Sequence, residues 1–238
     1  MSSETDFQNL RNLIFFMLLG DGSICKTEEH HNNCLEITHS IAQKDYLFYK
    51  MGLLEEYGIK IGKPYYRKDK MDCRIRTERN EIFTIIRKRC YDVNGKKYLS
   101  KRMLRNLDPL GLSLWYMDDG SAKIIHPSWR RNIYSIEGRN TTKLNQIKLS
   151  VCNFDEESNN NAIDILNSNF GLSFDLYLEK SKKQNKSYPV LCLSGKNQID
   201  LFKEIVQPHI VPSMEYKINH PTTFYNFSLE ETERNDNS

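Results

Sequence analysis

Two aspartates, Asp21 and Asp119, each stand directly before a glycine at the end of a strongly apolar segment. The segments are residues 15–22 and 114–120, and both have the composition of a helix that is buried on every side. A carboxylate in the last turn of a helix lies at the negative end of the helix dipole, where an anion is disfavoured. Two such helices packed side by side would bring the two carboxylates together, and a divalent cation would neutralise them. The pattern therefore predicts a metal site.

Residues 60–105 form a strongly basic block, with 16 Lys and Arg against 5 Asp and Glu, which is a local net charge of +11. Because the whole chain carries +3, the remainder sums to −8. Basic stretches interleaved with aromatic residues, such as Tyr65, Tyr66 and Tyr98 here, are typical of phosphate-binding surfaces. A solvated charged face has the same composition, so the block alone leaves both interpretations open.

The cysteine pattern and the hydropathy indicate an intracellular protein that does not enter a membrane. None of the six cysteines belongs to a C-x-x-C pair, which favours reduced thiols over zinc ligands or disulfides. The longest apolar run, residues 13–19, is too short to cross a bilayer, and the N-terminus has neither a secretory signal nor an Arg-rich transit peptide. We therefore expect a soluble protein in a cellular compartment that the sequence does not specify.

Other catalytic patterns carry little weight in this sequence. His30 and His31 fall in a strand connection, and no zinc-type cysteine spacing accompanies them or His39, so a metal role is not predicted for these histidines. Because a glycine-rich phosphate loop and a G-x-S-x-G elbow are both absent, nucleotide-driven and acyl-transfer chemistry have no support.

The elements that must position the two aspartates follow the same order in both halves of the chain. Residues 35–40 and 147–152 alternate like half-buried strands, and helices open after them at Asp45 and Asp155 and end at Gly58 and Gly171. Each half continues with two strands and a helix; the strands are predicted over 59–67, 73–77, 172–179 and 188–193, and the helices over 81–90 and 199–206. The order predicts an internally duplicated α/β (α+β) protein built from two pseudo-symmetric αββαββα halves.

The expected domain organisation follows from this duplication. We expect an N-terminal extension over residues 1–9, a first half over 10–105, a second half over 106–226, and a loose acidic tail over 227–238. An insertion-like stretch in the second half, residues 126–143, carries Arg130 and Arg131 and is a candidate DNA-contacting loop.

The two motifs resemble those of the LAGLIDADG homing endonucleases, in particular the intron-encoded monomeric branch. Leu18-Leu19-Gly20-Asp21 is similar to its L-I-L-G-D motif, and Trp115-Tyr116-Met117-Asp118-Asp119-Gly120 to its W-F-M-D-D-G motif. The stretches 96–99 and 210–217 resemble two further elements of that branch. Phe15 and Phe16 depart from the pattern, because a tight helix seam often uses glycine or alanine at such positions.

The resemblance implies two antiparallel, saddle-shaped sheets over the DNA and a central interface of the two motif helices. It implies a monomer that binds a long, asymmetric double-stranded target and hydrolyses phosphodiester bonds to leave a staggered cut, spreading its host intron. The expected cofactor is Mg²⁺, with Mn²⁺ as a substitute and Ca²⁺ as an ion that binds without supporting cleavage.

The resemblance also assigns the site residues. Asp21 and Asp119 are expected to bind the metal and take part in catalysis, with Gly20 and Asp118 beside them in the metal set. Asp118 is expected to play a supporting or capping part. Lys97 and Lys217 occupy similar places in the two halves and are expected to act at the cleavage centre, where an ammonium can offset developing negative charge. Lys97 lies in the basic block, so a phosphate contact is its alternative role.

Strand alternation supplies the candidates for DNA recognition. If Cys73, Ile75 and Thr77 pack inward, Arg74 and Arg76 face the major groove and can each contact a guanine. In the second half Phe174, Leu176 and Leu178 are expected inward and Tyr177 outward. The full set of predicted DNA-binding residues is Arg67, Lys68, Arg74, Arg76, Arg130, Arg131, Lys148 and Tyr177.

Two other functions remain open on the same scaffold. One is an RNA-binding intron maturase, whose partner is its own intron RNA. The other is a DNA-binding regulator that never cuts, and the acidic residue and lysine present in each half argue against it.

Overall fold

The computed structural model describes residues 4–26, 31–67, 69–125, 143–180 and 186–218. The first half of the chain contains α1 (Glu4–Leu19), β1 (Gly22–Cys25), β2 (Cys34–Ser40), η1 (Ile41–Gln43), α2 (Lys44–Glu55), β3 (Tyr65–Arg67), β4 (Asp72–Arg76) and α3 (Glu81–Cys90). The short helix α4 (Lys101–Leu104) leads to the second half, which contains α5 (Pro109–Asp119), β5 (Gly120–Ile125), β6 (Lys143–Ser150), α6 (Glu156–Phe170), β7 (Asp175–Lys180), β8 (Ser187–Ser194), α7 (Lys196–Val206), η3 (Gln207–His209) and η4 (Pro212–Lys217).

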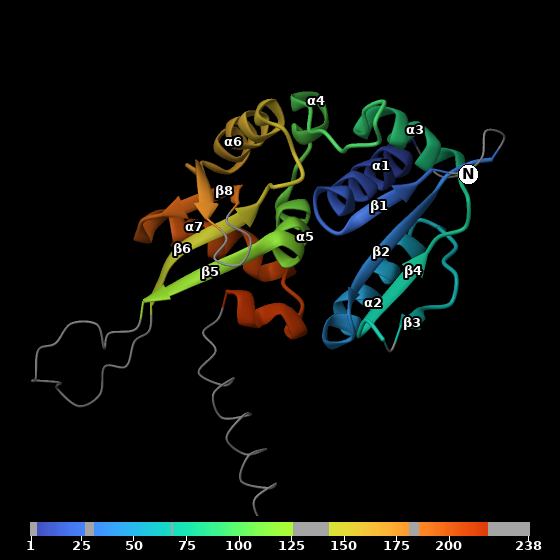
Figure 1. Cartoon of the computed structure of the whole chain (residues 1–238), viewed down its shortest axis with the longest axis horizontal. Helices are drawn as coiled ribbons and strands as arrows, with labels where there is room; N and C mark the ends of the chain where they lie inside the picture. The colour runs from blue at the N-terminus through green and yellow to red at the C-terminus, as the bar shows by residue number, and fades with distance from the viewer. Residues whose placement is uncertain (1–3, 27–30, 68, 126–142, 181–185, 219–238) are drawn as a thin grey trace, which may run out of the picture.

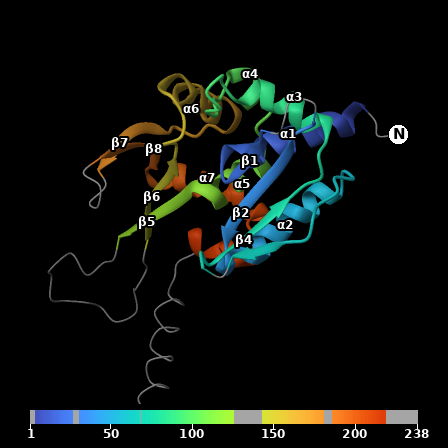
Figure 2. The same cartoon turned by 45° about the vertical axis from the view of Figure 1, so that its right-hand side comes forward.

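The two halves repeat one sheet topology. Each has a four-stranded antiparallel sheet, in the order β1-β2-β4-β3 or β5-β6-β8-β7. Gly22 pairs with Ile37 in the first sheet and Gly120 pairs with Leu149 in the second, so the glycine after each motif aspartate has the same register. Figure 1 shows the sheets on opposite sides of α1 and α5, and Figure 2 shows the same arrangement turned by 45°. The predicted fold class of two pseudo-symmetric halves is confirmed.

The motif helices α1 and α5 form the centre of the core. Leu13 through Leu19 and Gly111 through Met117 are buried without interruption. The two helices approach closely at two glycines: a Cβ on Gly111 would lie 2.7 Å from Phe16 Cγ, and one on Gly20 would lie 2.2 Å from Asp118 Oδ2. The bulky Phe16 therefore fits the seam because the opposite helix has a glycine there.

The boundaries of α6 and α3 follow the capping signals in the sequence, whereas α2 begins one residue before the predicted Asp45, with no side-chain cap, and ends at Glu55. The side chain of Asp155 accepts a hydrogen bond of 2.8 Å from the Ser158 N–H at the start of α6, and Gly171 ends that helix in the left-handed conformation with a φ of 68°. The boundaries of α3, Glu81 and Cys90, agree with the predicted ones. No helix in the described part of the chain is long and apolar enough to cross a membrane.

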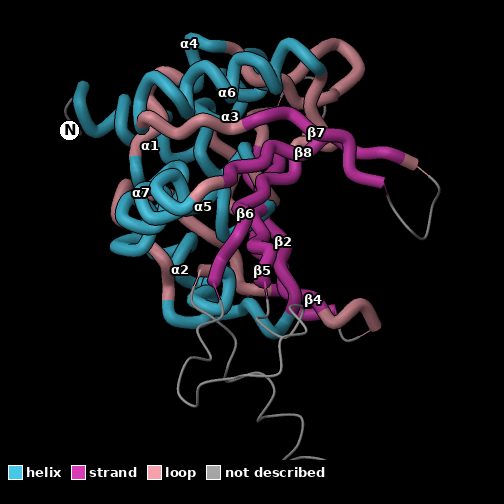
Figure 3. Tube along the Cα trace, turned by 90° about the vertical axis from the view of Figure 1, so that its left-hand side faces the viewer, coloured by secondary structure: helices cyan, strands magenta, loops and turns pink. Residues whose placement is uncertain are grey.

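The predicted inward face was right for β4 and wrong for β7. Cys73, Ile75 and Thr77 are buried, as expected. Leu176 and Leu178 were expected inward, but they are 37% and 70% exposed. The reason is that β7 is the edge strand of its sheet, and α7 packs on β6 and β8 instead. Figure 3 shows β7 and β8 extending away from the helices.

Candidate metal and catalytic centre

The last turns of α1 and α5 meet and bring three aspartates together. The backbone N–H of Asp21 donates to Asp118 Oδ2 over 3.0 Å, and Asp119 follows directly on the same helix as Asp118. The side chain of Asp118 is fully buried, whereas that of Asp21 is 42% exposed. The predicted approach of the two motif ends is therefore what the structure shows.

Asp118 is neutralised by a buried lysine from α2. Lys50 Nζ lies 2.6 Å from Asp118 Oδ1, and both side chains are fully buried. Burial alone would raise the pKa of Asp118, but the charge of Lys50, the neighbouring His39, and the hydrogen bonds from Lys50 and the Asp21 N–H together lower it. Both oxygens of Asp118 thus have protein partners, Lys50 Nζ at Oδ1 and the Asp21 N–H at Oδ2.

His39 on β2 connects this buried pair to Asp21. Its Nε2 lies 3.1 Å from Lys50 Nζ, and its Nδ1 lies 3.3 Å from Asp21 Oδ2. Burial, followed by the charge of Lys50, lowers the pKa of His39 to about 3, so the ring is neutral. An ammonium can only donate, so Nε2 is the acceptor and Nδ1 carries the proton that points at Asp21. His39 therefore holds the Asp21 carboxylate in place.

No role in the site was predicted from the sequence for His39 or Lys50, although the sequence contains an indication of each. Leu35, Ile37 and His39 share the buried face of β2, and Lys50 lies on the buried stripe of α2 with Leu47 and Leu54. A titratable side chain at a core position of each element was the available clue. Asp21, His39 and Asp118 present possible metal-ligand atoms within 4.8 Å of one another.

The lysines Lys97 and Lys217 cap the ends of the two motif helices. Lys97 Nζ donates to the carbonyls of Leu18 at 2.9 Å, Gly20 at 2.9 Å and Gly22 at 3.0 Å. Lys217 Nζ donates to the Met117 carbonyl at 2.5 Å and to the Asp118 carbonyl at 3.1 Å. Burial lowers the pKa of both ammoniums, and the aspartates oppose this effect. The two predicted lysines thus lie at equivalent positions beside the carboxylates.

Among the described residues, no ammonium contacts the side chain of Asp21 or Asp119. In the described part of the chain the neutral ring of His39 is the basic side chain in contact with Asp21, and Asp119 has no ion pair. Burial raises the pKa of Asp21, and the charge of Asp118 adds to this effect. Burial, then Asp118 and Asp21, raises the pKa of Asp119 to about 7. These two carboxylates offer the hard oxygen ligands that Mg²⁺ prefers, while the Gly20 carbonyl is engaged by Lys97.

The raised pKa of Asp119 predicts that stability without metal falls as the pH rises. Between about pH 4, where an unfolded aspartate loses its proton, and the folded value of about 7, the folded state retains a proton that the unfolded state has lost. Stability therefore decreases with pH across this window. In EDTA, raising the pH from 5 to 8 should lower the melting temperature of the unmodified protein more than that of Asp119→Asn. Adding Mg²⁺ at pH 8 should raise the melting temperature of the unmodified protein more than that of Asp119→Asn. Parallel pH profiles would contradict the assignment.

The four predicted DNA-reading cations that the structure describes are paired with acids on the sheets. Glu36 accepts from Arg74 Nη1 at 3.1 Å and from Arg76 Nη2 at 2.6 Å. Other pairs join Arg67 Nε to Asp72 at 2.7 Å and Lys148 to Glu179 at 2.7 Å, and Tyr177 is 54% exposed. Lys68, Arg130 and Arg131 lie outside the described residues.

Known proteins resemble this chain in sequence and in fold. The model of the LAGLIDADG DNA endonuclease family matches residues 11–201. Protein RecA of Mycolicibacterium fallax is 28% identical over 91% of this chain and 46% of its own length, so the chain spans about half of that relative. A probable intron-encoded endonuclease 1 of Wickerhamomyces canadensis is 26% identical over 84% of this chain and 80% of its own length. The structure of the homing endonuclease I-WcaI bound to its DNA recognition sequence superposes with a TM-score of 0.65 at 20% identity, covering 88% of this chain and 85% of that one.

Proposed function

The chain belongs to the LAGLIDADG DNA endonuclease family, and on that premise we propose that it is a homing endonuclease that cuts both strands of a long, asymmetric DNA target with Mg²⁺. The observation that carries this proposal is the contrast among the three aspartates. Asp118 is neutralised by Lys50, whereas Asp21 and Asp119 have raised pKa values and contact no ammonium of the residues that the structure describes. A pair of carboxylates left uncompensated at two adjoining helix ends is suited to a divalent cation.

Each residue of the centre has a separate task in this proposal. Asp21 and Asp119 would hold the metal, which when bound activates water and neutralises charge on the scissile phosphate. His39 fixes the orientation of Asp21 through Nδ1. Lys97 and Lys217 compensate the negative helix ends with their ammoniums and place positive charge beside the phosphate site.

The domain organisation supports action as a monomer. A single chain supplies both motif helices, both sheets and both lysines, so the central helix pair is complete without a second copy. The proposed target is asymmetric because the exposed faces of the two sheets carry different residues. The probable intron-encoded endonuclease among the relatives supports a role in intron mobility.

The sheet faces predict how duplex binding responds to charge. Glu36→Gln should release Arg74 and Arg76 from their shared partner and strengthen duplex binding about threefold to tenfold, with a steeper salt dependence, because two more guanidiniums become available to phosphates. Fluorescence anisotropy of a labelled duplex in Ca²⁺, at salt concentrations from about 50 to about 200 mM, measures the affinity and its salt dependence. Glu204→Gln on α7 is the matched control. Unchanged or weaker binding by Glu36→Gln would place the duplex elsewhere.

The proposed function is tested by cleavage of a plasmid library that carries random inserts, in Mg²⁺, with the cut ends sequenced. One recurrent long site with a fixed stagger supports the endonuclease and identifies its target. Tight binding to structured RNA without cleavage would favour the maturase instead, and duplex binding at one site without cleavage would favour the regulator.

A further inference from the structure

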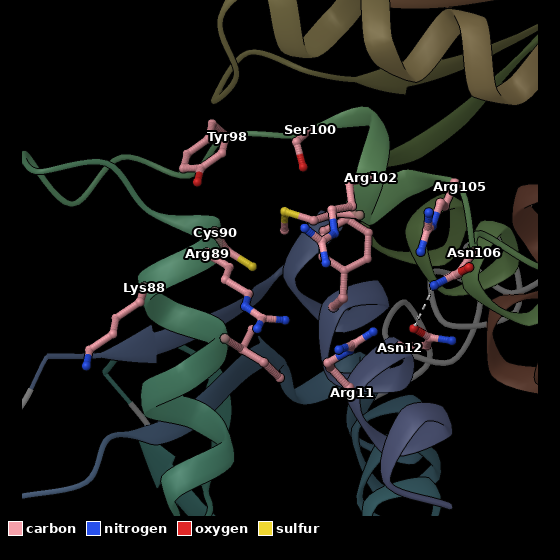
Figure 4. A pocket seen from close by; sticks show the side chains of 13 residues that line it. Arg11, Asn12, Lys88, Arg89, Cys90, Tyr98, Ser100, Arg102, Arg105 and Asn106 are labelled. Carbon is pink, nitrogen blue, oxygen red and sulfur yellow. Dashed lines mark hydrogen bonds between the residues drawn. The ribbon is translucent and has the colours of Figure 1, made fainter. Parts of the chain in front are cut away.

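A basic cavity lies on the helical side of the first half, between the middle of α1, the C-terminal part of α3, and the segment 98–106 that includes α4. Its volume is about 310 Å³. Figure 4 shows that its labelled side chains come from all three segments, with Arg11 below, Arg89 on the α3 side, and Arg102 and Arg105 above. We call this feature the basic cavity.

The arginines of the basic cavity repel one another. None of Arg11, Arg89, Arg102 and Arg105 belongs to an ion pair in the described part of the chain. Burial lowers the pKa of Arg11, and the charges of the other three lower it further. Four guanidiniums around one cavity without a carboxylate partner favour an anionic ligand, and guanidiniums bind phosphate oxygens well.

The cavity also offers apolar and aromatic surface. Phe15, Ile86 and Cys90 line it and are 6%, 2% and 3% exposed, and Tyr98 lies on its upper side in Figure 4. At its edge the amide of Asn106 donates to Asn12 Oδ1 over 3.3 Å. An apolar and aromatic floor beside guanidiniums is the combination that holds a base next to its phosphate.

The basic cavity is separate from the candidate cleavage centre. Arg11 and Asp21 are ten positions apart along α1 and the turn that follows it, which at the rise of an α-helix corresponds to about 15 Å. The basic cavity therefore lies beside the middle of α1, whereas the candidate cleavage centre follows the C-terminal end of that helix. A ligand of the basic cavity would not occupy the metal site.

We propose that the basic cavity binds one unpaired nucleotide of a single-stranded nucleic acid, with the base against Phe15 and Tyr98 and the flanking phosphates on the arginines. The volume lies at the lower end of the range for small-molecule pockets, about 300 to 1,000 Å³, which suits one nucleotide. A base in a duplex is stacked between its neighbours and cannot enter such a cavity, so the proposal specifies an unpaired strand. This site goes beyond the proposed endonuclease activity and does not depend on it.

The test compares the full-length unmodified protein with Arg89→Glu/Arg102→Glu, both exposed residues, and with Lys196→Glu/Lys203→Glu on α7, which changes the net charge equally. Fluorescence anisotropy with labelled unstructured RNA and DNA 12-mers should show binding weakened at least tenfold by the arginine pair and less than threefold by the lysine pair. Duplex binding should change less than threefold in both variants. The proposal would be overturned if the arginine double variant lost as much affinity for the duplex as for single strands, or if it lost no affinity for single strands.

Competition identifies what the cavity recognises. Adenosine monophosphate should displace the 12-mer at least tenfold more effectively than inorganic phosphate if the base is held, whereas equal competition would reduce the site to an anion site and contradict the proposal. A preference between the RNA and DNA strands identifies which kind of nucleotide the cavity takes.

If the double variant fails to melt cooperatively, Arg105→Glu replaces it, because this side chain is exposed at the rim. Crosslinking of a 5-iodouridine strand should map to the peptide that contains Tyr98.

Discussion

Replacing Asp21 or Asp119 with asparagine is expected to abolish double-strand cleavage, with a loss of at least about 100-fold in rate, while duplex binding in Ca²⁺ persists. Asparagine preserves the shape of each helix end but removes one of the two carboxylates whose pKa is raised by burial and by the neighbouring aspartates. The measurement is cleavage of the library-derived target in Mg²⁺ beside anisotropy binding in Ca²⁺. Each variant should at most nick one strand.

The control for this prediction is Asp164→Asn on α6, an aspartate that is 58% exposed and pairs with Lys101. It loses one carboxylate of the same kind without touching the helix ends, so its cleavage should stay near that of the unmodified protein. Full double-strand cleavage by Asp21→Asn or Asp119→Asn would refute a shared metal centre. Loss of duplex binding together with cleavage would show that the carboxylates act on folding or binding instead.

Local signals predicted much of the fold because they act within a few residues. Asp155 and Gly171 delimit α6 as the capping pattern indicated, and the two motif segments became the buried central helices. The position of β7 in its sheet is a long-range property, so the alternation of Leu176 and Leu178 could not reveal that no helix covers them. The core of each half was therefore more predictable than its edge.

The candidate site was predictable where the two halves repeat and was missed where they differ. The common register of Gly22 with Ile37 and of Gly120 with Leu149 makes Val151 the counterpart of His39, two residues further along. The second half therefore has an apolar side chain where the first has the histidine that holds Asp21. Asp118 likewise stands where the first motif has Gly20. Residues that repeat in the two halves therefore indicate Asp21 and Asp119, but they do not indicate the network around His39 and Asp118, which is not repeated.

This unrepeated network predicts the largest effect on stability. Lys50→Met should lower the free energy of unfolding by about 3 to 5 kcal/mol at pH 7, because it leaves the charge of Asp118 buried without its partner. Urea denaturation followed by circular dichroism measures the change. Lys50→Met/Asp118→Leu removes both charges and should recover most of the loss, whereas Lys44→Met, an exposed lysine at the start of α2, should change stability little.

The pH dependence separates a lost charge interaction from lost packing. The pKa of Asp118 is lowered in the folded state, so its pair with Lys50 contributes stability above the unfolded value and loses it as the pH falls through the folded one. In Lys50→Met the same carboxyl lacks the ammonium and can be protonated at a higher pH. The difference in stability between the two proteins should therefore shrink as the pH falls from 7 toward 4. A difference that stays constant with pH would mean that Lys50 stabilises the protein by packing alone, and Asp118 would then no longer be distinguished by charge from Asp21 and Asp119.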